Sequence, residues 1–146
     1  GINAEYGEQM SLSGIKISKE AMEAFNAQKL QHNARAVVYK INDHQTEIVV
    51  EKIYSVTQSL EDVVNDLPEK DARYVTYDLE LKQEGCEMAK LTFIMWAPEA
   101  ASSRAKMSYT STKSECLNNW SGIQLQIQAT SFDEVTLEYM QEKLKK

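Results

Sequence analysis

The chain has 146 residues, the usual size of one domain, since domains most often run to about 100–150 residues. Hydrophobic residues make up 42% of the sequence and charged residues 26%, which is ordinary for a soluble globular protein. The 22 acidic residues outnumber the 16 basic ones, and the formal net charge is −6. Because attraction to phosphate backbones needs clustered Lys and Arg, this balance argues against nucleic acid as a partner.

Cysteine and histidine are too sparse for a metal site. Cys86 and Cys116 lie far apart, no Cys-x-x-Cys pair exists, and His32 and His44 are not spaced to complete a zinc site. We therefore expect two reduced thiols, no bound metal and no cofactor.

The sequence contains no recognisable targeting or membrane segment. No apolar run approaches the roughly 18 residues of a membrane span, so we expect no insertion into membranes. Residues 1–9 have neither a basic start nor an apolar core, and Met10 looks like the natural start. We expect 1–9 to be an expression remnant, 10–146 to be a single domain, and the protein to be intracellular.

In the first half of the chain, the apolar pattern predicts a helix, a hairpin and a second helix. Ser18 is a suitable N-cap for a helix over 19–30. Two β-branched segments, 34–41 and 46–53, flank a polar turn and predict a β-hairpin. A short helix with a serine cap follows at 59–66 and must end before Pro68.

In the second half, three further strands and two further helices are predicted. The segment 72–81 alternates and reads as a strand, 82–86 is a turn, and the nearly continuous apolar run 89–96 predicts a central strand. The remaining elements are a long helix over 102–120, an alternating strand over 123–129 and an amphipathic helix over 132–144. Helices before, between and after the strands predict a mixed sheet covered on both faces.

No catalytic constellation is apparent. The two histidines lie near a helix end and in a hairpin turn, and the glycines are isolated rather than grouped in a phosphate-binding loop. No histidine is placed by sequence to activate Cys86 or Cys116. We therefore do not expect an enzyme; a thiol enzyme using one of these cysteines is an alternative that rapid alkylation at neutral pH would support.

The long helix departs from the acidic average of the chain. Between 102 and 113 there are three basic residues and no acid. At 100° per residue, the side that carries Tyr109 and Cys116 should face the core. Met107 then lies on the opposite side with Arg104 and Lys106 beside it. A methionine rimmed by cations suits an acidic, partly apolar protein surface.

A purely structural interpretation of these residues is also open. Arg104 and Lys106 could simply keep the helix soluble while Met107 packs under a neighbouring segment. The last helix needs no binding role, because Asp133 and Glu134 in its first turn and lysines in its last turn complement the helix dipole.

The sequence around the long helix resembles the signature of the actin-depolymerising factor/cofilin family. The resemblance rests on WAPEA at 96–100 and RAKMSYTSTK at 104–113, and it extends over 10–146. It implies the ADF-homology fold, an α/β fold of the α+β type whose central mixed sheet of five to six strands is sandwiched between helices. It also implies binding to actin monomers and filaments, followed by filament depolymerisation and severing. A monomer-sequestering module with little severing activity is the alternative.

The resemblance further assigns two actin-binding surfaces to this chain. The monomer-and-filament surface combines the N-terminal lead, the long helix and the segment before the last helix. Its residues are Ser11, Leu12, Ser13, Gly14, Arg104, Lys106, Met107, Thr110, Ser111, Ser131, Asp133 and Glu134. The filament-only surface comprises Lys90, Glu142, Lys143 and Lys146.

The chain departs from the family pattern in two places. Relatives carry several basic residues where this chain has 87–90, and here only Lys90 is basic while Glu87 is acidic. We therefore expect weakened binding on the filament side. The segment 31–35 lacks the basic insert that serves nuclear import in vertebrate relatives, so nuclear import has no support.

Regulation and localisation follow from the same resemblance. Ser13, directly before Gly14, is the phosphorylation candidate, and Ser11 competes with it. Phosphoinositides are implied as ligands of the basic helix. We expect a monomer that acts in the cytoplasm on the actin cytoskeleton.

Overall fold

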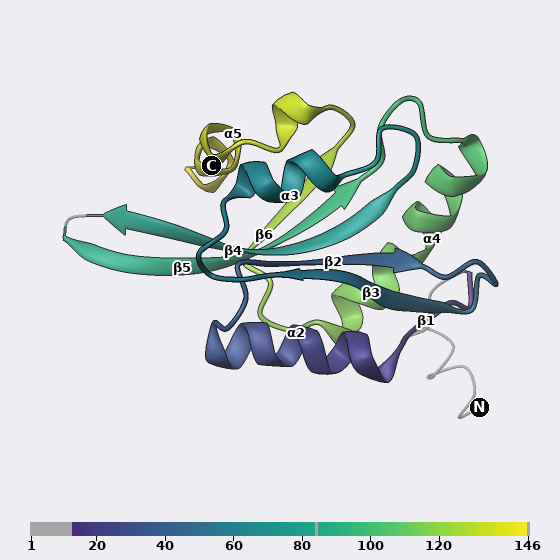
Figure 1. Ribbon diagram of the computed structural model, residues 1–146, viewed down its shortest axis with the longest axis horizontal. Coiled ribbons are helices and arrows are strands. Elements are labelled where there is room, and N and C mark those ends of the chain that lie inside the picture. Colours follow the sequence, from purple (N-terminus) through teal and green to yellow (C-terminus); the bar gives the residue numbers. More distant parts are fainter. Residues whose placement is uncertain (1–12, 84, 146) are drawn as a thin grey trace.

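The computed structural model, which describes residues 13–83 and 85–145, contains one mixed six-stranded sheet (Figure 1). The strand order is β1-β3-β2-β4-β5-β6. The pairs β1–β3 and β5–β6 are parallel, and the other neighbours are antiparallel. The strands are β1 (Lys16–Ile17), β2 (Ala36–Ile41), β3 (Glu47–Tyr54), β4 (Arg73–Gln83), β5 (Cys86–Trp96) and β6 (Leu125–Ala129).

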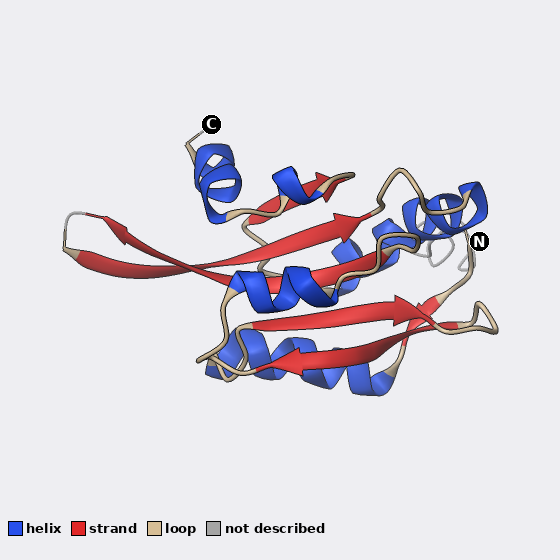
Figure 2. Cartoon of the chain, turned by 45° about the horizontal axis from the view of Figure 1, so that its top comes forward, coloured by secondary structure: helices blue, strands red, loops and turns tan. Residues whose placement is uncertain are grey.

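Helices cover both faces of this sheet (Figure 2). Phe25 and Trp120 belong to the core cluster on one face, whereas Val63 and Met140 belong to the cluster on the other. The predicted sandwich is therefore confirmed. The helices are α2 (Lys19–Gln31) and α4 (Ser103–Asn119) on the first face, and α3 (Leu60–Asp66), the 3-10 helix η1 (Phe132–Glu134) and α5 (Leu137–Leu144) on the second.

Serine caps begin three of the helices, as their sequences predict. The hydroxyls of Ser18, Ser59 and Ser102 accept hydrogen bonds from backbone N–H groups three residues further on. Such caps satisfy donors that have no partner within the helix, and they fix where each helix begins.

Three sequence-based expectations were wrong in detail. The segment 132–144 is not one helix: η1 is followed by α5, whose first turn is capped by the Thr136 hydroxyl. The acidic Asp133 and Glu134 therefore do not lie in the first turn of α5, where Glu138 stands instead. The strand β5 is interior but not central, because β2 and β4 occupy the middle of the sheet. The short strand β1 was not predicted.

The hairpin of β4 and β5 extends beyond the rest of the sheet (Figure 1). Both strands are longer than predicted, since β4 reaches Gln83 and β5 begins at Cys86. The first four residues of β5 are exposed, whereas the part from Leu91 to Trp96 is buried. The hairpin thus has a packed base and a solvent-exposed outer half.

Candidate actin-binding surfaces

The helix α4 is fixed to the sheet by one side, as its apolar spacing predicts. Tyr109, Thr112, Cys116 and Trp120 are buried against the sheet, and Ala105 is half-buried. A helix held along its whole length presents its opposite side as a rigid surface.

The outward side of α4 carries the residues that the charge pattern singled out. The side chain of Met107 is 71% exposed, and Arg104 and Thr110 are also exposed. Lys106 is half-buried, and its Nζ donates to the Glu99 carbonyl at 2.9 Å. The structure therefore excludes the alternative that Met107 packs under a neighbouring segment of the described chain.

The half-buried Ser111 differs from its exposed neighbours because its hydroxyl donates to the backbone. Its acceptors are the carbonyls of Met107 at 2.8 Å and Ser108 at 3.3 Å. These bonds hold the Ser111 side chain against the backbone of α4, so it lies beside Met107 and does not project beyond it.

The described end of the N-terminal lead lies against α4. The hydroxyl oxygen of Ser13 is 2.6 Å from that of Thr112. Gly14 has a φ of +76°, a left-handed conformation that favours glycine. Ser11 and Leu12 lie outside the described residues.

The segment before α5 leaves the sheet next to the segment that leads into α4. The N–H of Ala97 donates to the Ala129 carbonyl at 2.9 Å, so the two chains run side by side there. Ser131 and Asp133 are exposed, whereas Glu134 is half-buried. One oxygen of Glu134 accepts from both the N–H and the hydroxyl of Thr130. The Glu134 carboxylate therefore takes part in hydrogen bonds within the protein.

Phe132 is an exposed residue that the sequence assigned to a buried helix face. It is 40% exposed, and its ring packs against that of Trp96 at a centroid distance of 4.8 Å, with the two ring planes tilted by 36°. It stands between two predicted contact residues, Ser131 and Asp133. The available signal in the sequence was Thr136, a residue type that favours the N-cap position. It indicates that α5 begins after Thr136 and that Phe132 lies outside this helix.

Cross-strand register decides which hairpin residues share a face with α5. Lys90 pairs with Leu79, which belongs to the core cluster that also contains Met140 of α5. Since directly opposed residues point to the same side of a sheet, Lys90 lies on the α5 face. Glu142 and Lys143 of α5 are exposed, and Lys146 lies outside the described residues.

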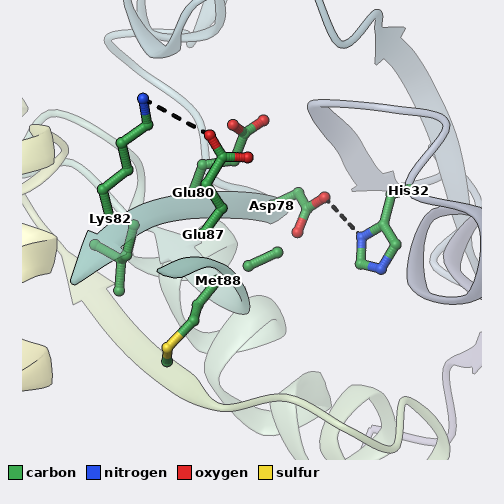
Figure 3. A pocket seen from close by; sticks show the side chains of 8 residues that line it. His32, Asp78, Glu80, Lys82, Glu87 and Met88 are labelled. Atoms are coloured by element: carbon green, nitrogen blue, oxygen red, sulfur yellow. Dashed lines mark hydrogen bonds and ion pairs between the residues drawn. The ribbon is translucent and has the colours of Figure 1, made fainter. Parts of the chain in front are cut away.

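The acidic Glu87 is opposed by Lys82 in the hairpin register and lies on the face opposite Lys90. Figure 3 shows Glu87 in a pocket together with Lys82 and His32. Glu87 pairs with Lys82, a cation that sequence reasoning missed, at 3.6 Å. Together they line a cavity of about 530 Å³ that also includes His32 and Asp78. The His32 Nδ1 lies 3.0 Å from an oxygen of Asp78. Within the described part of the chain, no group of His, Cys, Asp or Glu is arranged to hold a metal.

The cysteines have contrasting environments. Cys86 is exposed, whereas Cys116 is buried on the side of α4 that faces the sheet. Burial raises the pKa of the Cys116 thiol well above its usual value, with the Glu115 carboxylate adding to the effect. The Cys116 thiol is therefore neutral and unreactive near pH 7.

An exposed methionine between two cations on a helix that is packed against the sheet is typical of a protein-binding surface, and comparison with known proteins gives the family. Residues 14–145 match the family described as "Cofilin/tropomyosin-type actin-binding protein". Actophorin of Acanthamoeba castellanii is 40% identical over 92% of this chain and 98% of its own. Cofilin of Schizosaccharomyces pombe is 44% identical with the same coverage. The crystal structure of Streptomyces griseoflavus cofilin superposes with a TM-score of 0.83 at 33% identity, covering 90% of this chain and 97% of that one.

The chain belongs to the actin-depolymerising factor/cofilin family. The family comprises actin-binding proteins and not enzymes, which confirms the prediction that the chain is not an enzyme. The predicted ADF-homology fold is confirmed as well. In addition, none of the helices in the described ranges is both long and apolar enough to cross a membrane.

Proposed function

We propose that this protein binds actin monomers and filaments through α4 and promotes the depolymerisation and severing of filaments. The observation that carries the proposal is the 71% exposed Met107, which projects from a helix whose first three turns contain cations and no acid. An exposed apolar side chain rimmed by charge is typical of a protein interface.

Each part of this surface has a distinct role in the proposal. Met107 enters an apolar cleft on actin, where its flexible thioether adapts to the available shape. Arg104 and Lys106 meet acidic groups around that cleft and speed the encounter. The flanking contacts come from the lead and from the segment before α5: Ser11, Leu12, Ser13, Gly14, Thr110, Ser111, Ser131, Asp133 and Glu134.

Filament disassembly follows if the protein binds one filament state more tightly than another. A ligand shifts an equilibrium only by its difference in affinity for the two states. We propose that α4 binds best to subunits in a twisted filament, in which the contacts between subunits are weaker. Severing then results from binding energy, without a chemical step.

Paired variants of exposed residues test the α4 surface. Met107→Ala should weaken binding to actin monomers at least tenfold, as expected for the loss of about 1.4 kcal/mol or more at an interface hot spot. Leu30→Ala is the matched control, because Leu30 is 74% exposed on α2. Arg104→Ala/Lys106→Ala should also abolish tight binding, with Lys19→Ala as a control for charge. Unchanged monomer affinity in folded Met107 and Arg104/Lys106 variants would exclude this surface.

On the filament side, we propose a second contact of reduced strength. Lys90 shares the α5 face with Lys143, which supports a common contact formed with Glu142 and Lys146. Glu87 places a negative charge on the same hairpin, and Lys82 offsets it in part. A contact with few net positive charges has weak electrostatic attraction to an acidic filament.

Filament pelleting and microscopy test this second contact. Lys90→Ala should reduce co-sedimentation with filaments but leave monomer affinity unchanged. Glu87→Lys should increase co-sedimentation, whereas Glu23→Lys, an equal charge change at an exposed position on α2, should not. Tight filament binding that Lys90→Ala leaves unchanged would exclude the contact. Filaments of undiminished length, together with intact monomer binding, would favour the monomer-sequestering alternative.

We also propose that the protein acts as a monomer on the cytoplasmic actin cytoskeleton and that phosphoinositides compete with actin for α4. Arg104 and Lys113 are cations on an acid-free stretch that phosphate groups can bind. Vesicles containing phosphoinositides should reduce actin binding, and the Arg104→Ala/Lys106→Ala variant should bind these vesicles less than the wild type does.

A further inference from the structure

The buried hydroxyl of Thr112 is bonded to a residue 99 positions earlier in the chain. Its Oγ1 lies 2.6 Å from the Ser13 Oγ, and Thr112 itself is completely buried. A buried hydroxyl without a hydrogen bond is costly, because it loses its water and gains nothing in return. The Ser13 hydroxyl therefore supplies the hydrogen-bond partner of the buried Thr112 hydroxyl in α4.

The backbone around Ser13 is arranged to make this contact. The Ser13 Oγ also accepts the N–H of Ile15 at 3.2 Å, and Ile15 is buried in the core. Lys16 then begins β1, which pairs with β3. The chain is thus held at two successive points, the core at Ile15 and α4 at Thr112.

Gly14 makes the turn between these two points possible. Its φ of +76° suits glycine, and a side chain at this position would meet no atom within 4 Å. Glycine is therefore required here for its backbone conformation rather than for lack of space. The result is a defined direction for the chain as it passes Ser13 at the surface of α4.

From this geometry we propose that Thr112 is a positioning residue, which holds Ser13 against α4 in the arrangement that binds actin. The inference rests on the proposed actin-binding surface and adds to it a residue that does not itself touch actin. A segment already held in its bound arrangement loses less conformational entropy on binding. Thr112 thereby raises affinity through Ser13.

A double-mutant cycle tests the proposal. Thr112→Val keeps the shape of the side chain and removes its hydroxyl, and Ser13→Ala removes the partner. Each should weaken monomer binding by roughly three- to tenfold, the effect of freeing one or two ordered side chains. The double variant should bind no more weakly than the weaker single variant, since both lose the same bond. Thr112→Ser, which retains a hydroxyl, should restore most of the affinity.

Two further measurements separate positioning from general destabilisation. Hydrogen exchange at the Ile15 amide should accelerate in Thr112→Val and Ser13→Ala but not in Thr112→Ser. Val63→Ala, which removes buried atoms under α3 on the other sheet face, should lower stability without weakening actin binding.

The outcomes distinguish this inference from the proposed function. If Thr112→Val binds actin normally, or if the two single effects add, the positioning role is overturned. The Arg104→Ala/Lys106→Ala variant is measured alongside. If the Arg104→Ala/Lys106→Ala variant loses actin binding, the proposed α4 surface stands whatever the result for Thr112. If that variant binds actin normally, the α4 surface itself is overturned.

Discussion

The hydroxyl of Tyr109 accepts a hydrogen bond from the backbone N–H of Ile41 at 2.9 Å. On the same residue, the backbone carbonyl accepts a hydrogen bond from the Tyr74 hydroxyl. A single residue of α4 is therefore joined to both β2 and β4, two positions after the exposed Met107. The orientation of the proposed binding face of α4 is set by these buried bonds as well as by apolar packing.

Replacing Tyr109 by Phe should destabilise the protein by about 1–3 kcal/mol, because the buried N–H of Ile41 loses its acceptor. Burial raises the pKa of Tyr109, so its hydroxyl stays neutral and the loss should be constant between about pH 6 and 9. Urea unfolding measures the change. Tyr139→Phe is the control: its hydroxyl makes only a long bond of 3.4 Å to Glu134, and a smaller loss is expected. Equal losses in the two variants would contradict the role assigned to Tyr109.

Phosphorylation of Ser13 should release the lead from α4. The oxygen that would carry the phosphate lies 2.6 Å from the Thr112 Oγ1, and esterification removes its proton and places a charged group beside this buried hydroxyl. The phosphate also brings about two negative charges to a surface proposed to bind an acidic partner. We expect faster hydrogen exchange at the Ile15 amide and a larger loss of actin affinity than in Ser13→Ala. Unchanged exchange at Ile15 in the phosphorylated protein would be inconsistent with this geometry.

Alkylation should distinguish the two cysteines. Iodoacetamide at pH 7.5 should modify Cys86 and leave Cys116 unmodified, because Cys116 is buried and its pKa is raised. Mass spectrometry of the native protein should show one added group, and the unfolded protein should show two. Rapid modification of Cys116 in the folded protein would instead support the thiol-enzyme alternative.

Glu134 should stabilise the turn after β6 in a pH-dependent manner. The hydrogen bond from the Thr130 N–H does most to lower the pKa of Glu134. Desolvation acts in the opposite direction, but further hydrogen bonds from the Thr130 and Tyr139 hydroxyls keep the pKa below its usual value. A lowered folded-state pKa contributes stability that is present above the unfolded pKa of about 4.3 and is lost as the pH falls through the folded value. Glu134→Gln should therefore cost about 1 kcal/mol at pH 7 and much less near pH 3.

Thermal unfolding across this pH range measures the effect, and Asp133→Asn provides the control. Asp133 is exposed, so its replacement should change the stability little. A constant gap between wild type and Glu134→Gln at all pH values would argue against the carboxylate interaction.

Most of the fold follows from local patterns in the sequence. Serine caps and apolar spacing locate α2, α3 and α4 to within a residue or two, because these signals act over a single turn. The strand β1 leaves no such signal: it exists only through parallel pairing with β3, about 30 residues away in the chain. The split between η1 and α5 was missed because an apolar periodicity of 3.6 continues across it, while the Thr136 cap decides the break.

The candidate surface was predictable only along α4. Its exposed side follows from helical geometry and a local excess of positive charge, both of which can be read within twenty residues. The contact between Ser13 and Thr112, in contrast, joins distant parts of the chain. That Glu87 and Lys90 lie on opposite faces follows from strand alternation, but only once β5 is known to begin at Cys86, which the sequence assigned to the turn. Which of the two faces carries Lys90 is set by its pairing with Leu79.

The outer half of the β4–β5 hairpin contributes little to the core, since its side chains from Cys86 to Ala89 face solvent. Substitutions there can change the charge presented to a filament with almost no penalty in folding. The proposed filament contact can therefore be strengthened or weakened by exchanging a few hairpin residues while the fold is kept. The exposed end of the hairpin therefore tolerates substitution more readily than α4, because the residues on one side of α4 are part of the core.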